Sequence, residues 1–193
     1  MRRTLSASLF LSAVGAAAVL LWASLVPSQA QQGAVADSLG HPMMPQKGDA
    51  PVQPIAAFSH KIHAGDNKIP CLYCHIGADK SPVARVPAVE TCMGCHKLVA
   101  TQKPGIVKLT QYWNNKQAIP WVKVNDVPDH VRFTHQRHIQ AGIACQTCHG
   151  EIQTEDRVKL AHTLNMGFCV TCHKQRINDP VHATSLDCAT CHK

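Results

Sequence analysis

Apolar residues are concentrated near the N-terminus and become sparse and irregular after it. Arg2 and Arg3 precede 23 uncharged residues, Thr4 to Val26, which would span about 34 Å as a helix and so could cross a bilayer. A signal peptide usually has a shorter apolar stretch, although Ser28-Gln29-Ala30 supplies the small residues that a signal peptidase recognises. We predict a membrane anchor at residues 1–30 with its arginines in the cytoplasm, and keep a cleaved signal peptide as the alternative.

The pattern changes after the predicted anchor. Residues 31–54 are rich in Gln, Gly, Ala and Pro, which predicts a flexible tether. Beyond it, periodic apolar segments are scarce, and aromatic residues make up only 5% of the chain. An ordinary fold of this size would need a larger side-chain core. We therefore expect residues 55–193 to form one domain of short helices and loops, with almost no sheet, organised around bound groups.

The cysteines indicate what those groups are. All ten fall into five copies of Cys-X-X-Cys-His, the signature of covalent c-type haem attachment. In this motif the two thiols bond to the porphyrin vinyl groups, and the histidine is the proximal iron ligand. No cysteine is left for a disulfide, a zinc site or an iron–sulfur cluster. We predict five covalent haems, attached at Cys71, Cys74, Cys92, Cys95, Cys145, Cys148, Cys169, Cys172, Cys188 and Cys191, with proximal ligands His75, His96, His149, His173 and His192.

The positive charge of the chain has a local explanation. The formal net charge is +7, which by itself would be compatible with binding to nucleic acid. Each haem, however, brings two propionates, so five haems add about ten negative charges that Lys and Arg can neutralise. We expect the basic residues to pair with propionates and to contact protein partners, and we predict no nucleic-acid binding.

An internal repeat precedes two of the haem motifs. Phe58-Ser-His60-Lys-Ile-His63 lies before Cys71, and Phe133-Thr-His135-Gln-Arg-His138 lies before Cys145. Each unit is followed by a second motif, whose first cysteine comes 21 residues later in the first half and 24 in the second. Duplication explains this pattern and predicts half-repeats at about 55–100 and 130–193.

The repeat also supplies iron ligands. Irons that only relay electrons are best six-coordinate, so five distal ligands are needed. Histidines three residues apart lie on neighbouring faces of one helical turn, where each can reach a different haem. His60, His63, His135 and His138 are therefore predicted distal ligands, which leaves one to find. Met166, His162 and His182 compete for that place, and His130 is expected to pack or to bond a propionate.

The segment between the halves, residues 97–129, has no cysteine and contains Tyr112, Trp113 and Trp121. It is either a packing spacer that covers haem edges or a docking surface, because aromatic and basic residues favour interfaces.

Two resemblances follow from these motifs. The Phe-Ser-His-Lys-Ile-His unit before Cys71-Leu-Tyr-Cys-His resembles the class III multihaem cytochromes (c3 and c7). A longer match over 58–97, 119–124, 128–149 and 166–169 resembles the pentahaem subunit of alternative complex III. It implies a multihaem cytochrome c fold of mostly loops and short α-helices around five haems, with one N-terminal transmembrane helix. It also implies that His60 and His135 each serve the haem that follows them, and it favours Met166 as the fifth distal ligand.

The same resemblance implies a bacterial inner-membrane complex that oxidises quinol, with the haem domain in the periplasm. Its partners would be an iron–sulfur protein, quinol-binding membrane proteins and a cytochrome c-type acceptor. The chain would be an electron-transfer subunit without catalytic residues of its own, since the chemistry belongs to the cofactors. The alternatives are a free periplasmic multihaem shuttle, a multihaem reductase of a small oxyanion, and the haem subunit of a quinone-reducing complex.

Overall fold

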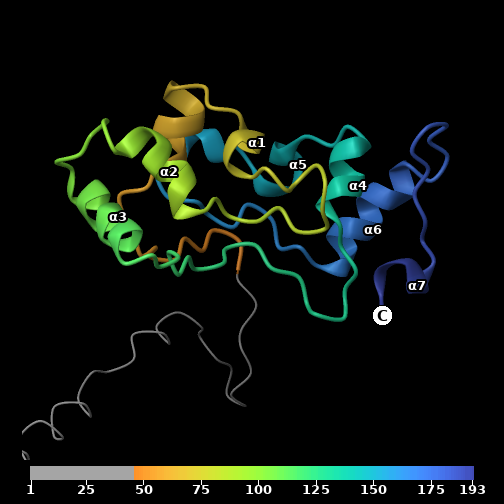
Figure 1. The fold of residues 1–193 in the computed structure, drawn as a ribbon. Helices are drawn as coiled ribbons and strands as arrows, with labels where there is room; N and C mark the ends of the chain where they lie inside the picture. The colour runs from red at the N-terminus through yellow and green to blue at the C-terminus, as the bar shows by residue number, and fades with distance from the viewer. Residues whose placement is uncertain (1–45) are drawn as a thin grey trace, which may run out of the picture.

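The protein is described here by a computed structural model of residues 46–193, which consists of short helices joined by irregular loops (Figure 1). The predicted anchor at 1–30 and most of the predicted tether at 31–54 lie outside these residues. Within residues 46–193 there is no β-strand, and an isolated antiparallel bridge joins Val131 to His192. The expected architecture of loops and short helices is confirmed for this part of the chain. In the same part, no helix has the length and apolar character needed to cross a membrane.

Five helices carry the cysteine motifs. In Figure 1 they follow one another across the molecule from α2 through α1, α5 and α6 to α7. Their bounds are α1 Cys71–Cys74, α2 Val89–His96, α5 Cys145–His149, α6 Met166–Gln175 and α7 Cys188–Cys191. The other elements are the π-helix η2 Lys61–Asp66, α3 Pro104–Asn114, α4 His135–Gln140 and the 3₁₀ helix η3 Ile152–Thr154.

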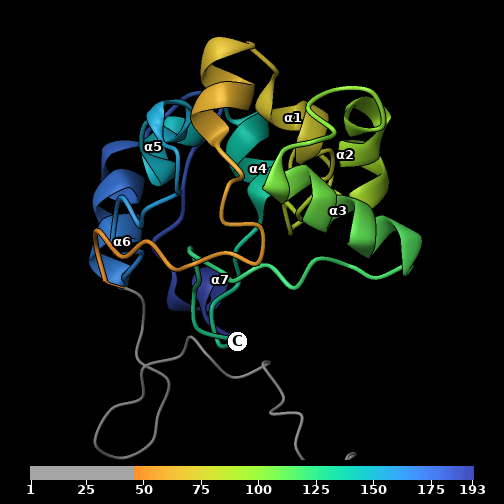
Figure 2. The same ribbon diagram turned by 90° about the vertical axis from the view of Figure 1, so that its left-hand side faces the viewer.

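The longest helix, α3, lies in the segment without cysteines. Pro104 occupies its first turn, where a missing N–H costs nothing. Ile106, Leu109 and Trp113 share one face of the helix by their spacing. This face packs into a small core with buried Ile55, Met93, Leu109 and Ile119, and Phe58 and Trp121 pack against the same cluster. The segment is thus a packing element of the first half, and Figure 2 places α3 beside α2.

The two halves support each other reciprocally. Near η2, the Ser59 hydroxyl donates to the Asp156 carboxylate at 2.7 Å, and the Lys61 N–H donates to the Glu155 carbonyl at 2.9 Å. In the other direction, the backbone N–H of His135 donates to the Pro82 carbonyl at 3.0 Å. Each helix that carries predicted distal ligands is therefore held by the loop that follows the first cysteine motif of the opposite half.

Candidate cofactor sites

Each motif places its two cysteines on a single helical turn. Cysteines three residues apart lie on the same face of a helix, and the histidine follows directly. The turn is closed by backbone hydrogen bonds, such as His75 N–H to Cys71 O and His192 N–H to Cys188 O, both 2.9 Å. All ten cysteines lie in the described part of the chain and form no disulfide. This arrangement fits covalent attachment of a porphyrin through two thioethers.

The electrostatics of the thiols suit the same chemistry. Burial raises the pKa of Cys92 and Cys148, and nearby cysteine thiols raise the pKa of both further. These side chains therefore stay protonated near neutral pH. A protonated thiol supplies both the sulfur and the hydrogen that add across a vinyl group.

Cysteines of different motifs approach one another in a regular order. Burial, followed by the proximity of the Cys71 thiol, raises the pKa of Cys145. The other neighbours across motifs are Cys74 with Cys95, Cys148 with Cys172, and Cys169 with Cys191. The attachment sites therefore form a row that begins at the Cys92 motif and continues through the Cys71, Cys145, Cys169 and Cys188 motifs, consistent with Figure 1.

Three of the predicted proximal histidines are oriented by backbone carbonyls. The His75 Nδ1 donates to the Arg85 carbonyl at 2.6 Å, and the His96 Nδ1 donates to the Val99 carbonyl at 3.0 Å. The His173 Nδ1 donates to the Ser185 carbonyl at 3.1 Å. A carbonyl can only accept, so Nδ1 carries the proton in each ring and Nε2 keeps its lone pair. This is how proteins orient metal-ligating histidines.

The two Phe-X-His-X-X-His units have the same geometry in space. Phe58 meets the ring of His60 edge-on at 4.9 Å and 85°, and Phe133 meets that of His135 at 4.8 Å and 86°. Phe58 also packs against His63, as Phe133 does against His138. The second histidine of each unit donates from Nδ1 to the carbonyl four residues earlier, at 2.7 Å in His63 and 2.8 Å in His138. Both units thus present Nε2 as a free electron-pair donor.

Predicted distal histidines lie opposite predicted proximal ones. The ring centroids are 6.0 Å apart for His63 and His96, 6.3 Å for His135 and His149, and 6.2 Å for His138 and His173. With metal–nitrogen bonds of about 2 Å and roughly 1 Å from nitrogen to ring centre, two imidazoles on one metal stand about 6 Å apart. The donor set therefore fits haem iron between these pairs. Ligation itself stays a prediction.

At the Cys71 motif, electrostatics indicate which histidines are neighbours. Burial, followed by the proximity of His75 and then His63, lowers the pKa of His60 to about 4. Burial, His135 and His75 lower the pKa of His149. Both rings are therefore neutral at physiological pH, the form that binds metal. His60 lies beside His75, as expected if it serves the Cys71 motif.

The candidates for the fifth distal ligand occupy different surroundings. Met166 is the first residue of α6 and is 67% exposed, while His162 stacks on Phe168 at 5.2 Å. The backbone N–H of His182 donates to Asp179 at 2.8 Å. The ring next to His192 is instead that of His130, which was expected to pack or to bond a propionate. No motif marks His130, because the backbone bridge that brings it there joins distant residues.

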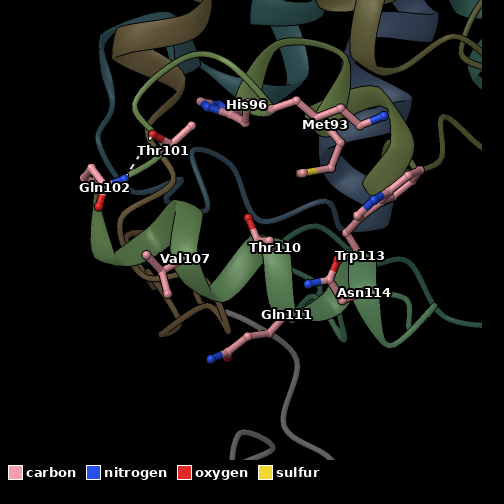
Figure 3. Close-up of a pocket in the computed structure, with 10 residues that line it drawn as sticks. Met93, His96, Thr101, Gln102, Val107, Thr110, Gln111, Trp113 and Asn114 are labelled. Carbon is pink, nitrogen blue, oxygen red and sulfur yellow. Dashed lines mark hydrogen bonds between the residues drawn. The ribbon is translucent and has the colours of Figure 1, made fainter.

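An open hollow of 540 Å³ lies between α2 and α3, beside His96, the motif histidine at the α2 end of the row (Figure 3). Met93, His96 and Trp113 contribute to its wall. The Lys97 ammonium lies 4.8 Å from the centre of the Trp113 ring, a cation–π contact at its rim.

Comparison with known proteins agrees with this cofactor chemistry. Residues 131–193 match the family described as cytochrome c7 and related cytochrome c, a range that holds three of the five motifs. The chain is also similar to the multihaem cytochrome c subunit of menaquinone reductase from Nitratidesulfovibrio vulgaris (strain Hildenborough). The two are 26% identical over 162 residues, which cover 73% of this chain and 77% of that protein. The predicted resemblance to c7-like cytochromes is confirmed over residues 131–193, and membership of that group implies covalent c-type haem. The count of five haems stays a prediction. The resemblance to alternative complex III stays a prediction.

Proposed function

We propose that this chain is a pentahaem electron-transfer subunit of a bacterial membrane complex that exchanges electrons with a quinone. The observation that carries the proposal is the single row of five motif helices, in which histidines lie opposite the motif histidines. When bound, each haem supplies an iron that takes up and gives back one electron. The residues of the chain hold these groups in a fixed order.

The histidine contacts favour relay over substrate chemistry. The Nδ1 hydrogen bonds to backbone carbonyls hold the imidazoles in place whatever the oxidation state of the iron. A histidine on each side would leave the iron no open position for a small oxyanion. This supports an electron-transfer subunit over the alternative of a multihaem reductase.

The direction of electron flow has two candidates. The resemblance to alternative complex III supports quinol oxidation, with electrons leaving to a periplasmic cytochrome c-type acceptor. The similarity to a menaquinone reductase subunit supports the opposite direction, in which the complex reduces quinone. The resemblance to alternative complex III also supports a haem domain in the periplasm, beside quinol-binding membrane proteins and an iron–sulfur protein. Quinol oxidation is our first proposal and quinone reduction the second.

The row has two ends, and we place a partner contact at the α2 end. Leu98 and Val99 lie two and three residues after the motif histidine of α2 and are 89% and 57% exposed. Together with Lys97 and Trp113 at the rim of the hollow, they provide the apolar, aromatic and cationic groups that interfaces use. We call Lys97, Leu98, Val99 and Trp113 the α2-end surface.

One purification tests the proposal. Membranes are solubilised in mild detergent, the tagged chain is isolated, and co-purifying subunits and covalent haem are measured by mass spectrometry. We expect five haems, membrane partners and an intact residue 1–30 segment. Recovery as a lone soluble protein lacking residues 1–30 would instead support the free periplasmic shuttle.

The same preparation separates the two directions. Quinol is added to the oxidised complex, and reduced acceptor cytochrome is added to a second sample with quinone. Rapid haem reduction by quinol, followed by electron transfer to the acceptor, supports the first proposal. Net quinone reduction by the reduced cytochrome supports the second. A high-spin ferric signal that changes on adding nitrite would support the reductase alternative.

A further inference from the structure

The last motif is held against a distant loop by backbone pairing. Asp187 caps α7 by accepting from the Ala189 N–H at 3.2 Å, and His192 then leaves the helix in an extended conformation. There it forms the antiparallel bridge with Val131. The pairing places His130, the residue before Val131, beside the end of the Cys188 motif.

Two further hydrogen bonds fix the register of this pairing. The Arg132 N–H donates to the Cys191 carbonyl at 2.7 Å, and the Lys193 N–H donates to the His130 carbonyl at 3.1 Å. They lie on either side of the bridge between Val131 and His192. The backbone of residues 130–132 is therefore aligned with that of 191–193, and the two rings are brought together by main-chain contacts.

The resulting ring pair resembles the pairs at the other sites. The centroids of His130 and His192 are 5.5 Å apart, with an angle of 17° between the ring planes. The three pairs described above lie at 6.0–6.3 Å. Opening the His130 pair by less than about 1 Å would admit a metal between two imidazole nitrogens.

From this pairing we propose that His130 is the distal iron ligand at the Cys188 motif, so that all five irons have two histidine ligands. The proposal rests on the proposed attachment of five haems and assigns no ligand role to Met166. It also completes the count, since His60, His63, His135 and His138 lie beside the other four motif histidines.

The test compares His130→Ala, His130→Met and Met166→Leu in the full-length protein, with His182→Ala as the matched control. Covalent haem is first counted by mass, and the haem peptides are mapped. This count tests the proposed function separately, because fewer than five haems in the unmodified protein would contradict the pentahaem assignment. Even then, a haem on the Cys188 peptide would allow its distal ligand to be measured. EPR and potentiometric titration then report on the ligands.

We expect His130→Ala to convert one of the five haems from low-spin to high-spin and to make it bind cyanide. His130→Met should keep that haem low-spin and raise its potential, because a thioether favours ferrous iron. Met166→Leu and His182→Ala should leave the spectra and potentials unchanged. Loss of a low-spin haem in Met166→Leu or in His182→Ala, or unchanged spectra in both His130 variants, would overturn the proposal.

Discussion

His135 is bound twice to Pro82, a residue of the opposite half of the molecule. The Pro82 carbonyl accepts from the backbone N–H of His135 at 3.0 Å and from its ring Nδ1 at 2.9 Å. Three residues further along the same loop, the Arg85 carbonyl accepts from the Nδ1 of His75 at 2.6 Å. One loop therefore orients an imidazole at each of two neighbouring sites. These sites are also neighbours in the row, because the proximity of the Cys71 thiol raises the pKa of Cys145.

The first prediction concerns the distal ligand that this loop orients. His135→Ala should open the iron at the Cys145 motif, because the ring opposite His149 is removed. We expect one haem to become high-spin and to bind carbon monoxide when reduced. The haem count should stay the same, since both thiols remain. Gln136→Ala, which alters the next residue of the same helix, is the control and should keep every haem low-spin.

The equivalent change in the other half is His60→Ala. It should open one haem in the same way, and combining it with His135→Ala should open two. If the single variants keep fully low-spin spectra, the pairing of these histidines with the following motifs is wrong.

The second prediction concerns the order of the sites. The Cys145 motif lies in the middle of the row, with two sites on either side. Replacing Cys145 and Cys148 by Ala should remove that haem and divide the row. The physiological donor should then rapidly reduce only the two haems on its own side, while dithionite reduces all four.

The control removes a site at the end of the row, by replacing Cys188 and Cys191 with Ala. In this variant the four remaining sites stay adjacent, so the donor should reduce all four haems together. If the donor docks at the Cys188 end of the row, it should reduce none of them rapidly. Stopped-flow spectroscopy measures both cases. Rapid donor reduction of all four haems in the Cys145/Cys148 variant would contradict the row.

The cofactor chemistry could be predicted from the sequence because it depends on local spacing. Two cysteines and a histidine within one turn define an attachment site, and Phe58 and Phe133 mark two equivalent ligand units. In each unit the second histidine is fixed by a carbonyl only four residues earlier, in Ser59 or Thr134. Short-range geometry of this kind is contained in the motif itself.

The remaining features depend on contacts between distant residues. Pro82 meets His135, and the bridge of Val131 with His192 brings in His130, although no repeat or motif links these positions. Helix α3 was not identified from the sequence, although its apolar spacing is visible at Ile106, Leu109 and Trp113. The sequence predicted only a packing spacer or a docking surface for this segment.

The third prediction concerns the α2-end surface. Leu98→Asp should leave folding and haem content unchanged, because the side chain is 89% exposed. If a partner covers it, burying a carboxylate there should weaken association at least about tenfold. Retention of partner subunits in detergent measures this. Val181→Asp, at a 75% exposed position in the second half, is the matched control and should retain them. Equal retention by both variants would place the contact elsewhere.

The last prediction tests the packing between the halves. A Cβ on Gly65 would collide with the backbone carbonyl of Gln153 in η3, which cannot rotate away. Gly65→Ala should therefore lower the free energy of unfolding by about 1–3 kcal/mol, the usual cost of overpacking. Gly94→Ala is the control, because a Cβ there meets nothing within 4 Å and alanine stabilises a helix relative to glycine. Urea unfolding of the haem-loaded proteins, followed by circular dichroism, gives both values. If Gly65→Ala is as stable as Gly94→Ala, η2 and η3 do not pack as closely in solution as described here.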